Sequence, residues 1–236
     1  MISGLPSASG VVRSQRESLR PPPKLSLSEW ADRYFVLSPE GAAEPGRWRT
    51  LPYQKGILDA ITDPEVSEVS IMKSARVGYT LCLTAAIGYY MHQDPSSILI
   101  VQPTVEDAKE FSKETITPML RDVPVLSVLK VKDRQEIAKE ESNTILHKAF
   151  RGGILSMIGA NSGTGFRRKS RRIIGFDEVD AYPPGGVGQE GDPIRLGKKR
   201  SESFWNRKLI HGSTPLKSGA SRIEKLFQAG DQRRFF

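Results

Sequence analysis

The chain has 236 residues, which is long enough for one well-buried domain. Its 35 Lys and Arg residues outnumber its 27 Asp and Glu residues, and the resulting formal charge of +8 favours a polyanionic partner without establishing one. The single cysteine, Cys82, excludes an internal disulfide or a cysteine-based zinc cluster. No segment is long and apolar enough to cross a membrane, and the N-terminus lacks the apolar core of a signal peptide, so we expect a cytoplasmic protein with a reduced, buried thiol.

Composition and periodicity predict an α/β fold. Residues 1–26 are rich in Ser, Arg and Pro and are expected to form a flexible or extended arm. Beyond them, strand-like and helix-like runs alternate, which predicts three layers with a mostly parallel central sheet. We expect helices over 27–35, 55–61, 79–91 and 105–121, a polar loop over 40–49, strands over 68–72, 97–101, 172–176 and 208–212, and a hairpin joining 143–150 to 154–159.

The segment from Val69 to Thr80 joins the first core strand to the next helix. A strand, a loop and a helix N-terminus form the layout of a phosphate-binding P-loop, in which backbone N–H groups cradle phosphates and a hydroxyl serves Mg²⁺. The usual pattern is G-x-x-x-x-G-K-S/T. Here Lys73 stands at the first glycine position and Tyr79 at the lysine position, with Arg76 in the middle of the loop. An ordinary turn is the alternative, because loops with one Gly and one Lys are common.

Two adjacent carboxylates, Asp177 and Glu178, follow the strand at 172–176. An open α/β sheet binds its ligands at the carboxyl ends of its strands. At that place Asp177 would orient Mg²⁺ through its water shell, and Glu178 would polarise an attacking water. An acidic helix cap after a strand is the alternative. The P-loop upstream, in the right order, favours the catalytic interpretation.

Two further segments fit a nucleotide site. Ser213 and Thr214 end the strand at 208–212, where hydroxyls would sense the γ-phosphate, although a Ser/Thr/Pro turn is equally compatible. Tyr53 and Gln54 come before the first core strand and would suit the face and the edge of an adenine.

A basic cluster lies between the glycine-rich residues 161–165 and the acidic strand. It could be a solvated loop, a contact to the DNA backbone, or the source of an arginine that stabilises transition-state charge, in cis or across a subunit interface. Arg167 is our candidate for that arginine. The three histidines show no zinc-ligand spacing, and we expect His211 to be packed in the core. The cluster consists of Arg167, Arg168, Lys169, Arg171 and Arg172.

Taken together, the chain resembles the ATPase part of the large terminase subunit of tailed bacteriophages, in the branch of the lambda-like A protein. The string Lys-Ser-Ala-Arg-Val-Gly-Tyr at 73–79 is unusual and specific to that branch, and it accounts for the displaced lysine. Arg168 departs from the acidic residue expected there, which leaves the electrostatics of its loop open. The matching segments are 51–54, 72–79, 102–104, 166–167, 169–170, 176–178, 190–191 and 212–215.

The resemblance implies a RecA/ASCE-like P-loop ATPase domain over residues 27–236, which uses ATP and Mg²⁺ to drive double-stranded DNA into a procapsid. Its partners would be DNA, the portal protein or procapsid, the small terminase subunit, and further copies of the chain in a ring on the portal. In isolation the domain would be a monomer, and its place would be the host cytoplasm. The family's C-terminal nuclease domain is missing from this sequence, so we expect no DNA cleavage.

The implied site uses the residues already singled out. Lys73 and Arg76 would hold the β- and γ-phosphates, while Thr80 and Asp177 would hold Mg²⁺. Further nucleotide contacts are expected from Ser74, Gly78, Tyr79, Tyr53, Gln54, Ser213 and Thr214. Glu178 and Arg167 would complete catalysis.

Two other functions stay open. A helicase-like P-loop DNA translocase would share these parts, but it should carry further arginine motifs in a second RecA-like lobe, for which this length leaves no room. A degenerate P-loop module that only binds DNA or a partner is favoured by the displaced lysine. The intact Asp177–Glu178 pair argues against that module.

Overall fold

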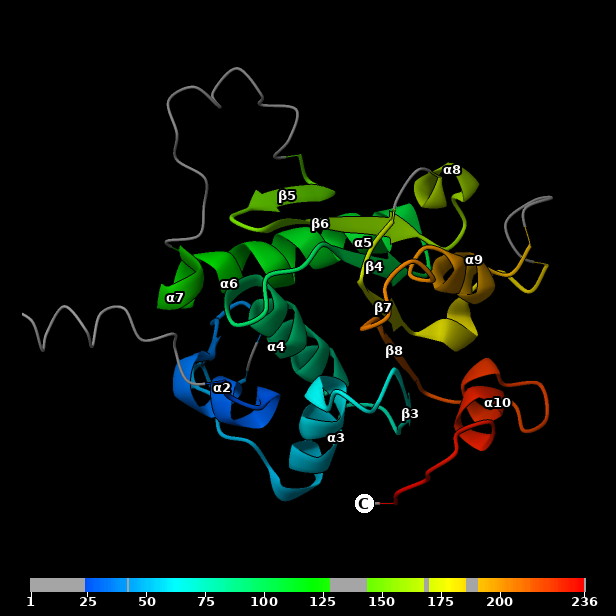
Figure 1. Cartoon of the computed structure of the whole chain (residues 1–236), viewed down its shortest axis with the longest axis horizontal. Helices are drawn as coiled ribbons and strands as arrows, with labels where there is room; N and C mark the ends of the chain where they lie inside the picture. The colour runs from blue at the N-terminus through cyan, green and yellow to red at the C-terminus, as the bar shows by residue number, and fades with distance from the viewer. Residues whose placement is uncertain (1–23, 42, 128–143, 168–169, 186–190, 236) are drawn as a thin grey trace, which may run out of the picture.

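The structure is a computed structural model that describes residues 24–41, 43–127, 144–167, 170–185 and 191–235 (Figure 1). Most of the arm expected over 1–26 lies outside the described residues, as do Arg168 and Lys169. The described part begins just before Leu25, which packs against the core and whose carbonyl accepts a hydrogen bond from the Tyr89 hydroxyl at 3.0 Å.

A six-stranded sheet lies at the centre, with strand order β3-β8-β7-β4-β6-β5. All neighbouring strands run parallel except β5 and β6, which form the predicted antiparallel hairpin. The expected mostly parallel α/β sheet is therefore confirmed. The strands are β3 (Glu68–Met72), β4 (Ile98–Gln102), β5 (His147–Phe150), β6 (Gly153–Gly159), β7 (Ile173–Asp177) and β8 (Lys208–Ser213).

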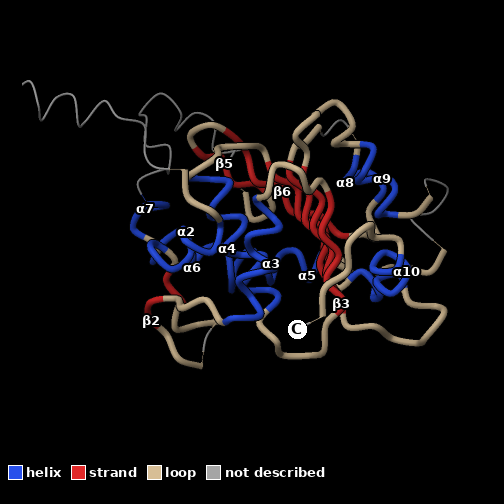
Figure 2. The backbone as a smooth tube through the Cα atoms, turned by 60° about the horizontal axis from the view of Figure 1, so that its bottom comes forward, coloured by secondary structure: helices blue, strands red, loops and turns tan. Residues whose placement is uncertain are grey.

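Both faces of the sheet are buried, because alternate residues along a strand enter different hydrophobic clusters. In β4, Ile98 and Ile100 join one cluster, whereas Leu99 and Val101 join the other. Helices therefore cover both sides in three layers (Figures 1 and 2). One side holds α2 (Leu27–Tyr34), α3 (Pro52–Thr62), α4 (Tyr79–His92), α5 (Val105–Phe111), the π-helical turn η1 (Ser112–Ile116), α6 (Thr117–Asp122) and α7 (Pro124–Ser127); the other holds α8 (Gly163–Phe166), the 3₁₀ turn η3 (Val179–Ala181), α9 (Pro193–Lys199) and α10 (Arg222–Gln228).

Helix α4 follows the loop over residues 73–78 and is buried along most of its length, from Cys82 to Met91. Its apolar residues all round the helix require this, because neither face can be left in water. Cys82 is buried as predicted, and burial raises the pKa of its thiol to about 12. None of the described helices, α4 included, combines the length and apolar character needed to span a bilayer.

The long helix expected over 105–121 is interrupted, which corrects the sequence prediction. Pro118 has no backbone N–H and cannot continue an α-helical ladder. The chain widens into η1 just before it, where the N–H of Thr117 bonds to the carbonyl of Ser112, and α6 then starts afresh. Pro118 was the visible signal for this break.

Two smaller expectations were also wrong. Residues 40–49 are not entirely loop, because β2 (Gly46–Arg47) pairs antiparallel with β1 (Val36–Leu37). Helix α3 starts at Pro52, not at Lys55, because proline at the first helical position has its φ already set for the helix. Tyr53 and Gln54 therefore lie in the first turn of a helix.

Candidate functional site

The loop between β3 and α4 projects from the carboxyl end of the sheet. The N–H of Lys73 bonds to the carbonyl of Ser213 at 3.1 Å, which carries the β3–β8 pairing one residue into the loop. Arg76 and Gly78 then take left-handed conformations, with φ of 63° and 78°. Gly78 is the N-cap of α4, so the free N–H groups of the first helical turn open onto the loop. Ser74 and Arg76 are exposed to any ligand placed there.

Tyr79 explains why this loop has no lysine at the usual position. The Tyr79 side chain turns away from the loop into the core, and its hydroxyl donates to the carbonyl of Phe176 at 3.2 Å. Its ring crosses β8 at Gly212, where a Cβ atom would lie only 2.0 Å from a ring carbon. Only the backbone of Tyr79 is therefore left for a phosphate.

Lys73 supplies the positive charge instead. Its Nζ lies 2.7 Å from Oε1 of Glu178 and 3.3 Å from Oγ1 of Thr214. The same atom is 5.7 Å from the centre of the Tyr79 ring, at cation–π distance. Lys73, at the start of the loop, thus places its ammonium group over the ring of Tyr79, which occupies the usual lysine position.

Glu178 is held in an unusual backbone conformation, with φ 48° and ψ 54°. A left-handed residue other than glycine costs about 1–3 kcal/mol and is kept where its surroundings fix it. Oε2 of Glu178 accepts from the Ser213 hydroxyl and from the Thr214 N–H, each at 3.3 Å. The predicted residues Lys73, Glu178, Ser213 and Thr214 thus meet in one place.

Asp177 is the most deeply buried carboxylate of the site, with 5% of its surface exposed. Burial raises its pKa to about 6, against the opposing effect of a hydrogen bond from Nε2 of Gln102 to Oδ2 at 3.1 Å. Oδ1 is the one buried side-chain oxygen in the described part of the chain that has no hydrogen-bond partner. Such an acceptor fits a hydrated Mg²⁺, which typically binds through one or two carboxylates plus substrate phosphates.

Gln102 is a residue of the site that the sequence motifs did not predict. It ends β4, and β4 pairs with β7, so its amide reaches Asp177 from the neighbouring strand. The strand order could not be derived from the sequence. The only signal in the sequence for a role of Gln102 was that it belongs to a segment shared with the resembling family.

Tyr53 and Gln54 lie against the loop between β3 and α4. The Tyr53 hydroxyl donates to the carbonyl of Val77 at 3.0 Å, and Nε2 of Gln54 donates to that hydroxyl at 3.4 Å. Oε1 of Gln54 accepts from the N–H of Leu51 at 3.0 Å, and the side chain is buried. Both residues therefore brace the loop, and their contact with an adenine stays a prediction.

The described arginines of the basic cluster have different surroundings. Arg172 pairs with Asp94, and Arg171 donates to the hydroxyl of Ser156 at 3.2 Å, both beside the amino end of β7. Arg167 instead follows α8 and is exposed. His211 is fully buried and stacks on the ring of Phe176 at 4.8 Å, which confirms its packing role.

The fold and site together define the class. A parallel sheet whose strand β3 leads through a glycine loop into the buried helix α4, with adjacent carboxylates at the end of β7, is the architecture of an α/β P-loop protein.

The chain belongs to the family of the phage terminase large subunit gpA, ATPase domain, whose sequence profile matches residues 42–236. It is 34% identical over 220 residues to the large terminase subunit of Enterobacteria phage P21, covering 93% of this chain and 34% of that protein. It is 36% identical over 211 residues to that of Escherichia phage lambda, covering 89% and 32%. The chain thus spans about a third of the length of these relatives.

Solved structures agree on the fold. The large terminase of bacteriophage HK97 superposes with a TM-score of 0.65 at 16% identity, covering 86% of this chain and 40% of that one. A variant of the ATPase domain of the Thermus phage P74-26 large terminase gives a TM-score of 0.52 at 14% identity, covering 78% and 72%. At such identities the likeness establishes the fold alone.

Proposed function

We propose that the chain hydrolyses ATP at the carboxyl ends of β3, β7 and β8. The contact between Lys73 and Glu178 carries this proposal. It brings the loop cation and a carboxylate suited to activating water within 2.7 Å of each other, beside the open N-terminus of α4. A triphosphate on that helix end would meet both groups.

Each residue has a distinct task in this proposal. Lys73 and Arg76 hold the β- and γ-phosphates, and backbone N–H groups of Ser74, Gly78 and Tyr79 cradle them. Thr80 and Asp177 would hold Mg²⁺, which neutralises charge on the phosphate oxygens when it is bound. Ser213 and Thr214, both in contact with Glu178, sense the γ-phosphate.

Glu178 must be released before it can act as a base. While Lys73 neutralises its carboxylate, the pair is mutually satisfied. Phosphate oxygens compete for the lysine, because charge-assisted hydrogen bonds are strong. Once Lys73 moves to the phosphates, Glu178 is free to accept a proton from the attacking water.

A hydrolysis assay with and without double-stranded DNA tests this proposal. We expect phosphate release that requires a divalent cation and rises with DNA. ATP binding without any turnover would favour the degenerate binding module instead. Turnover stimulated by single-stranded DNA, with strand separation, would favour the helicase-like translocase.

We further propose that the chain is the motor domain of a DNA-packaging machine. Membership of the terminase family and the likeness to two large terminase subunits support this. On this proposal its partners are double-stranded DNA, the portal or procapsid, and the small terminase subunit. It would work in the host cytoplasm as a ring on the portal and be a monomer when isolated.

Arg167 is proposed to act on a neighbouring subunit in that ring. Its exposure at the end of α8 supports a contact in trans, and arginines supplied this way raise turnover by roughly 10³–10⁵ in other P-loop enzymes. Specific activity should then rise with protein concentration, or on adding procapsid and DNA, and Arg167→Ala should remove most of that rise while ATP still binds. Lys199→Ala, another exposed cation, is the matched control. Activity that stays flat with concentration and is unaffected by Arg167→Ala would overturn this role.

A further inference from the structure

The short turn η3, which follows directly on the left-handed Glu178, is bound to α10 by a carboxylate. Oδ1 of Asp180 accepts from the N–H of Ile223 at 2.9 Å, and Oδ2 accepts from the N–H of Leu216 at 3.0 Å. Ile223 lies in the first turn of α10, and Leu216 lies in the loop that leads to it from β8. Asp180 therefore holds both the loop and the start of the helix against η3.

Arg222 makes the contacts in the opposite direction, from α10 to the turn. Its guanidinium donates to the carbonyls of Tyr182 and Pro183, each at 2.6 Å, and to the carbonyl of Val179 at 3.3 Å. Carbonyls at the end of a helical turn have no partner within the turn, and a charged donor binds them strongly. Asp180 and Arg222 thus form a clamp between η3 and α10.

Apolar packing supports the clamp. Val179, Tyr182 and Ile223 are buried in the same hydrophobic cluster, on the face of the sheet that carries α10. Burial alone would raise the pKa of Asp180, but hydrogen bonds from Ser221 and from the backbone of the loop and α10 outweigh it and hold the pKa below its usual value. The carboxylate of Asp180 is therefore bound in its charged form.

An ordinary helix cap does not account for these contacts. Helix α10 already has its own N-cap, because the hydroxyl of Ser221 accepts from the N–H of Glu224 at 3.1 Å. A cap would also not explain the bond from Leu216, which comes five residues before Ser221, or the return contacts of Arg222. The contacts tie the turn after Glu178 to the rest of the domain.

The position of η3 fixes Glu178 in two ways. The backbone carbonyl of Glu178 accepts from the N–H of Ala181 at 2.9 Å, so the turn continues from the strained residue. The N–H of Asp180 donates to the hydroxyl of Ser213 at 3.2 Å, and that hydroxyl lies 3.3 Å from Oε2 of Glu178. A strained backbone persists only where its surroundings determine it. The clamp is part of those surroundings.

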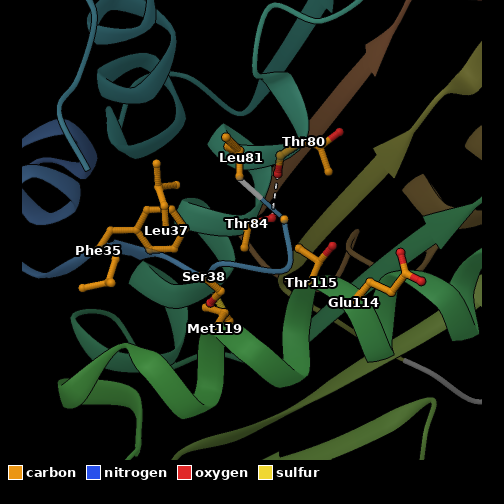
Figure 3. A pocket seen from close by; sticks show the side chains of 11 residues that line it. Phe35, Leu37, Ser38, Thr80, Leu81, Thr84, Glu114, Thr115 and Met119 are labelled. Carbon is orange, nitrogen blue, oxygen red and sulfur yellow. Dashed lines mark hydrogen bonds between the residues drawn. The ribbon is translucent and has the colours of Figure 1, made fainter. Parts of the chain in front are cut away.

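The other face of the sheet offers a place for a control. A cavity of about 130 Å³ lies there beside the first turn of α4, and Glu114 is an exposed carboxylate on its wall (Figure 3). The hydrogen bond drawn in Figure 3, from the hydroxyl of Thr84 to the carbonyl of Thr80 at 2.6 Å, stays within α4. None of the residues that line this cavity belongs to η3 or α10.

We propose that Asp180 and Arg222 are positioning residues for catalysis: they fix η3 to α10, and this keeps Glu178 in the left-handed conformation that directs its carboxylate to the nucleotide site. The proposal rests on the proposed hydrolysis of ATP with Glu178 as the general base. It adds two residues that do not touch the nucleotide and act through Glu178.

The first test separates turnover from binding. Asp180→Ala should lower turnover at saturating ATP by about tenfold or more, because a small misplacement of a catalytic group can cost roughly 10²-fold. ATP affinity measured by calorimetry should stay within about twofold, because the loop between β3 and α4 is unchanged. Arg222→Ala should show the same pattern.

Two variants serve as controls. Glu224→Ala also removes two hydrogen bonds of a carboxylate near the start of α10, from the N–H of Gly219 at 2.7 Å and from the hydroxyl of Ser218 at 3.3 Å, but both lie within residues 218–224. Glu114→Ala removes a carboxylate on the other face of the sheet. Both variants should match the wild type in turnover and in ATP affinity.

The outcomes distinguish this proposal from the proposed function. Wild-type turnover in Asp180→Ala, or a loss of the same size in Glu224→Ala, would overturn the clamp and leave ATP hydrolysis standing. A wild type without turnover would overturn both. If Asp180→Ala does not fold, Asp180→Asn replaces it, since its side-chain oxygen keeps one of the two contacts. Wild-type turnover in Asp180→Asn would then overturn the clamp.

A double variant separates positioning from a loss of folded protein. If Asp180 acts through Glu178, its removal should have no further effect once Glu178 is replaced, because residues that act as a unit are not additive. Single-turnover hydrolysis by Glu178→Gln and by Glu178→Gln with Asp180→Ala should therefore agree within about twofold. A further loss as large as that caused by Asp180→Ala alone would show that Asp180 acts independently of Glu178, and would overturn the proposal.

Discussion

The amino and carboxyl ends of the central strands carry charged residues of the same kinds but use them differently. At the amino ends, the cations are paired within the chain. Arg172 binds Asp94, and Lys198 binds Glu68 at 2.7 Å. Lys208 donates to the carbonyl of Asp63.

At the carboxyl ends, a buried carboxylate oxygen lacks a partner and the backbone is strained. Among the described residues, buried side-chain atoms without a hydrogen-bond partner occur at both ends: Nε of Arg171, Arg172 and Arg200 near the amino ends, and Oδ1 of Asp177 at the carboxyl ends. The carboxyl ends differ in that the unpaired atom is an acceptor and that the next residue, Glu178, is left-handed. Buried polar atoms are normally satisfied, and strained residues persist where function requires them. We therefore propose that the amino ends stabilise the fold and that the carboxyl ends bind a ligand.

The largest expected effect that tests this division comes from Glu178. Glu178→Gln should lower ATP turnover by about 10²–10⁴-fold, the usual contribution of a general base, while ATP still binds. Phosphate release and equilibrium binding measured on the same preparation check it. Glu202→Gln, an exposed carboxylate near the amino ends, should match the wild type in both.

A pair of lysine variants tests the two ends of the strands separately. Lys73→Ala should weaken ATP binding by about 10–150-fold, because a hydrogen bond to a charged group contributes about 1.5–3 kcal/mol. Lys198→Ala should lower the free energy of unfolding and leave ATP affinity unchanged. Calorimetry and chemical denaturation of both variants decide this. The reverse pattern would place the ligand at the amino ends.

His211, which approaches Glu68 near the amino ends of the strands, makes the free energy of unfolding depend on pH. Its pKa is lowered to about 3, first by burial and then by the charge of Lys198, so its 3.5 Å approach to Glu68 is that of a neutral ring. Below pH 6.5, His211 is protonated in the unfolded chain but stays neutral in the folded chain. The free energy of unfolding therefore falls as the pH drops through that value. The loss should reach about 2 kcal/mol at pH 5. Denaturation of wild type and His211→Gln from pH 7 to 5 checks it, and equal slopes would contradict it.

Tyr79 should show the smallest effect. Tyr79→Phe removes one buried hydrogen bond and should cost about 1 kcal/mol of unfolding free energy, with ATP affinity unchanged. Tyr90→Phe is the matched control, because its hydroxyl makes a similar buried bond to the carbonyl of Ile61 at 3.0 Å. If only Tyr79→Phe impaired ATP binding, its hydroxyl would be a ligand contact.

The carboxyl-end residues were largely predictable because they follow strands that the sequence marks clearly. The predicted strand at 68–72 has the bounds of β3, and the acidic pair follows an apolar run that is buried throughout β7. Local patterns suffice for this, since strand ends in a parallel sheet converge.

What could not be predicted depends on strand order and side-chain direction. Gln102 reaches Asp177 only because β4 lies beside β7. Tyr79 turns inward only because Gly212 leaves room on β8. Arg171 and Arg172 were grouped with Arg167 by their position in the sequence, but Arg171 and Arg172 lie beside the amino end of β7, whereas Arg167 directly follows α8.

A structure of the chain with a non-hydrolysable ATP analogue and Mg²⁺ would show whether bound phosphates take Lys73 away from Glu178. We expect phosphates along the loop from Lys73 to Thr80, with Nζ of Lys73 bound to a phosphate oxygen and withdrawn from Glu178. An analogue bound elsewhere, with the Lys73–Glu178 contact intact, would contradict it.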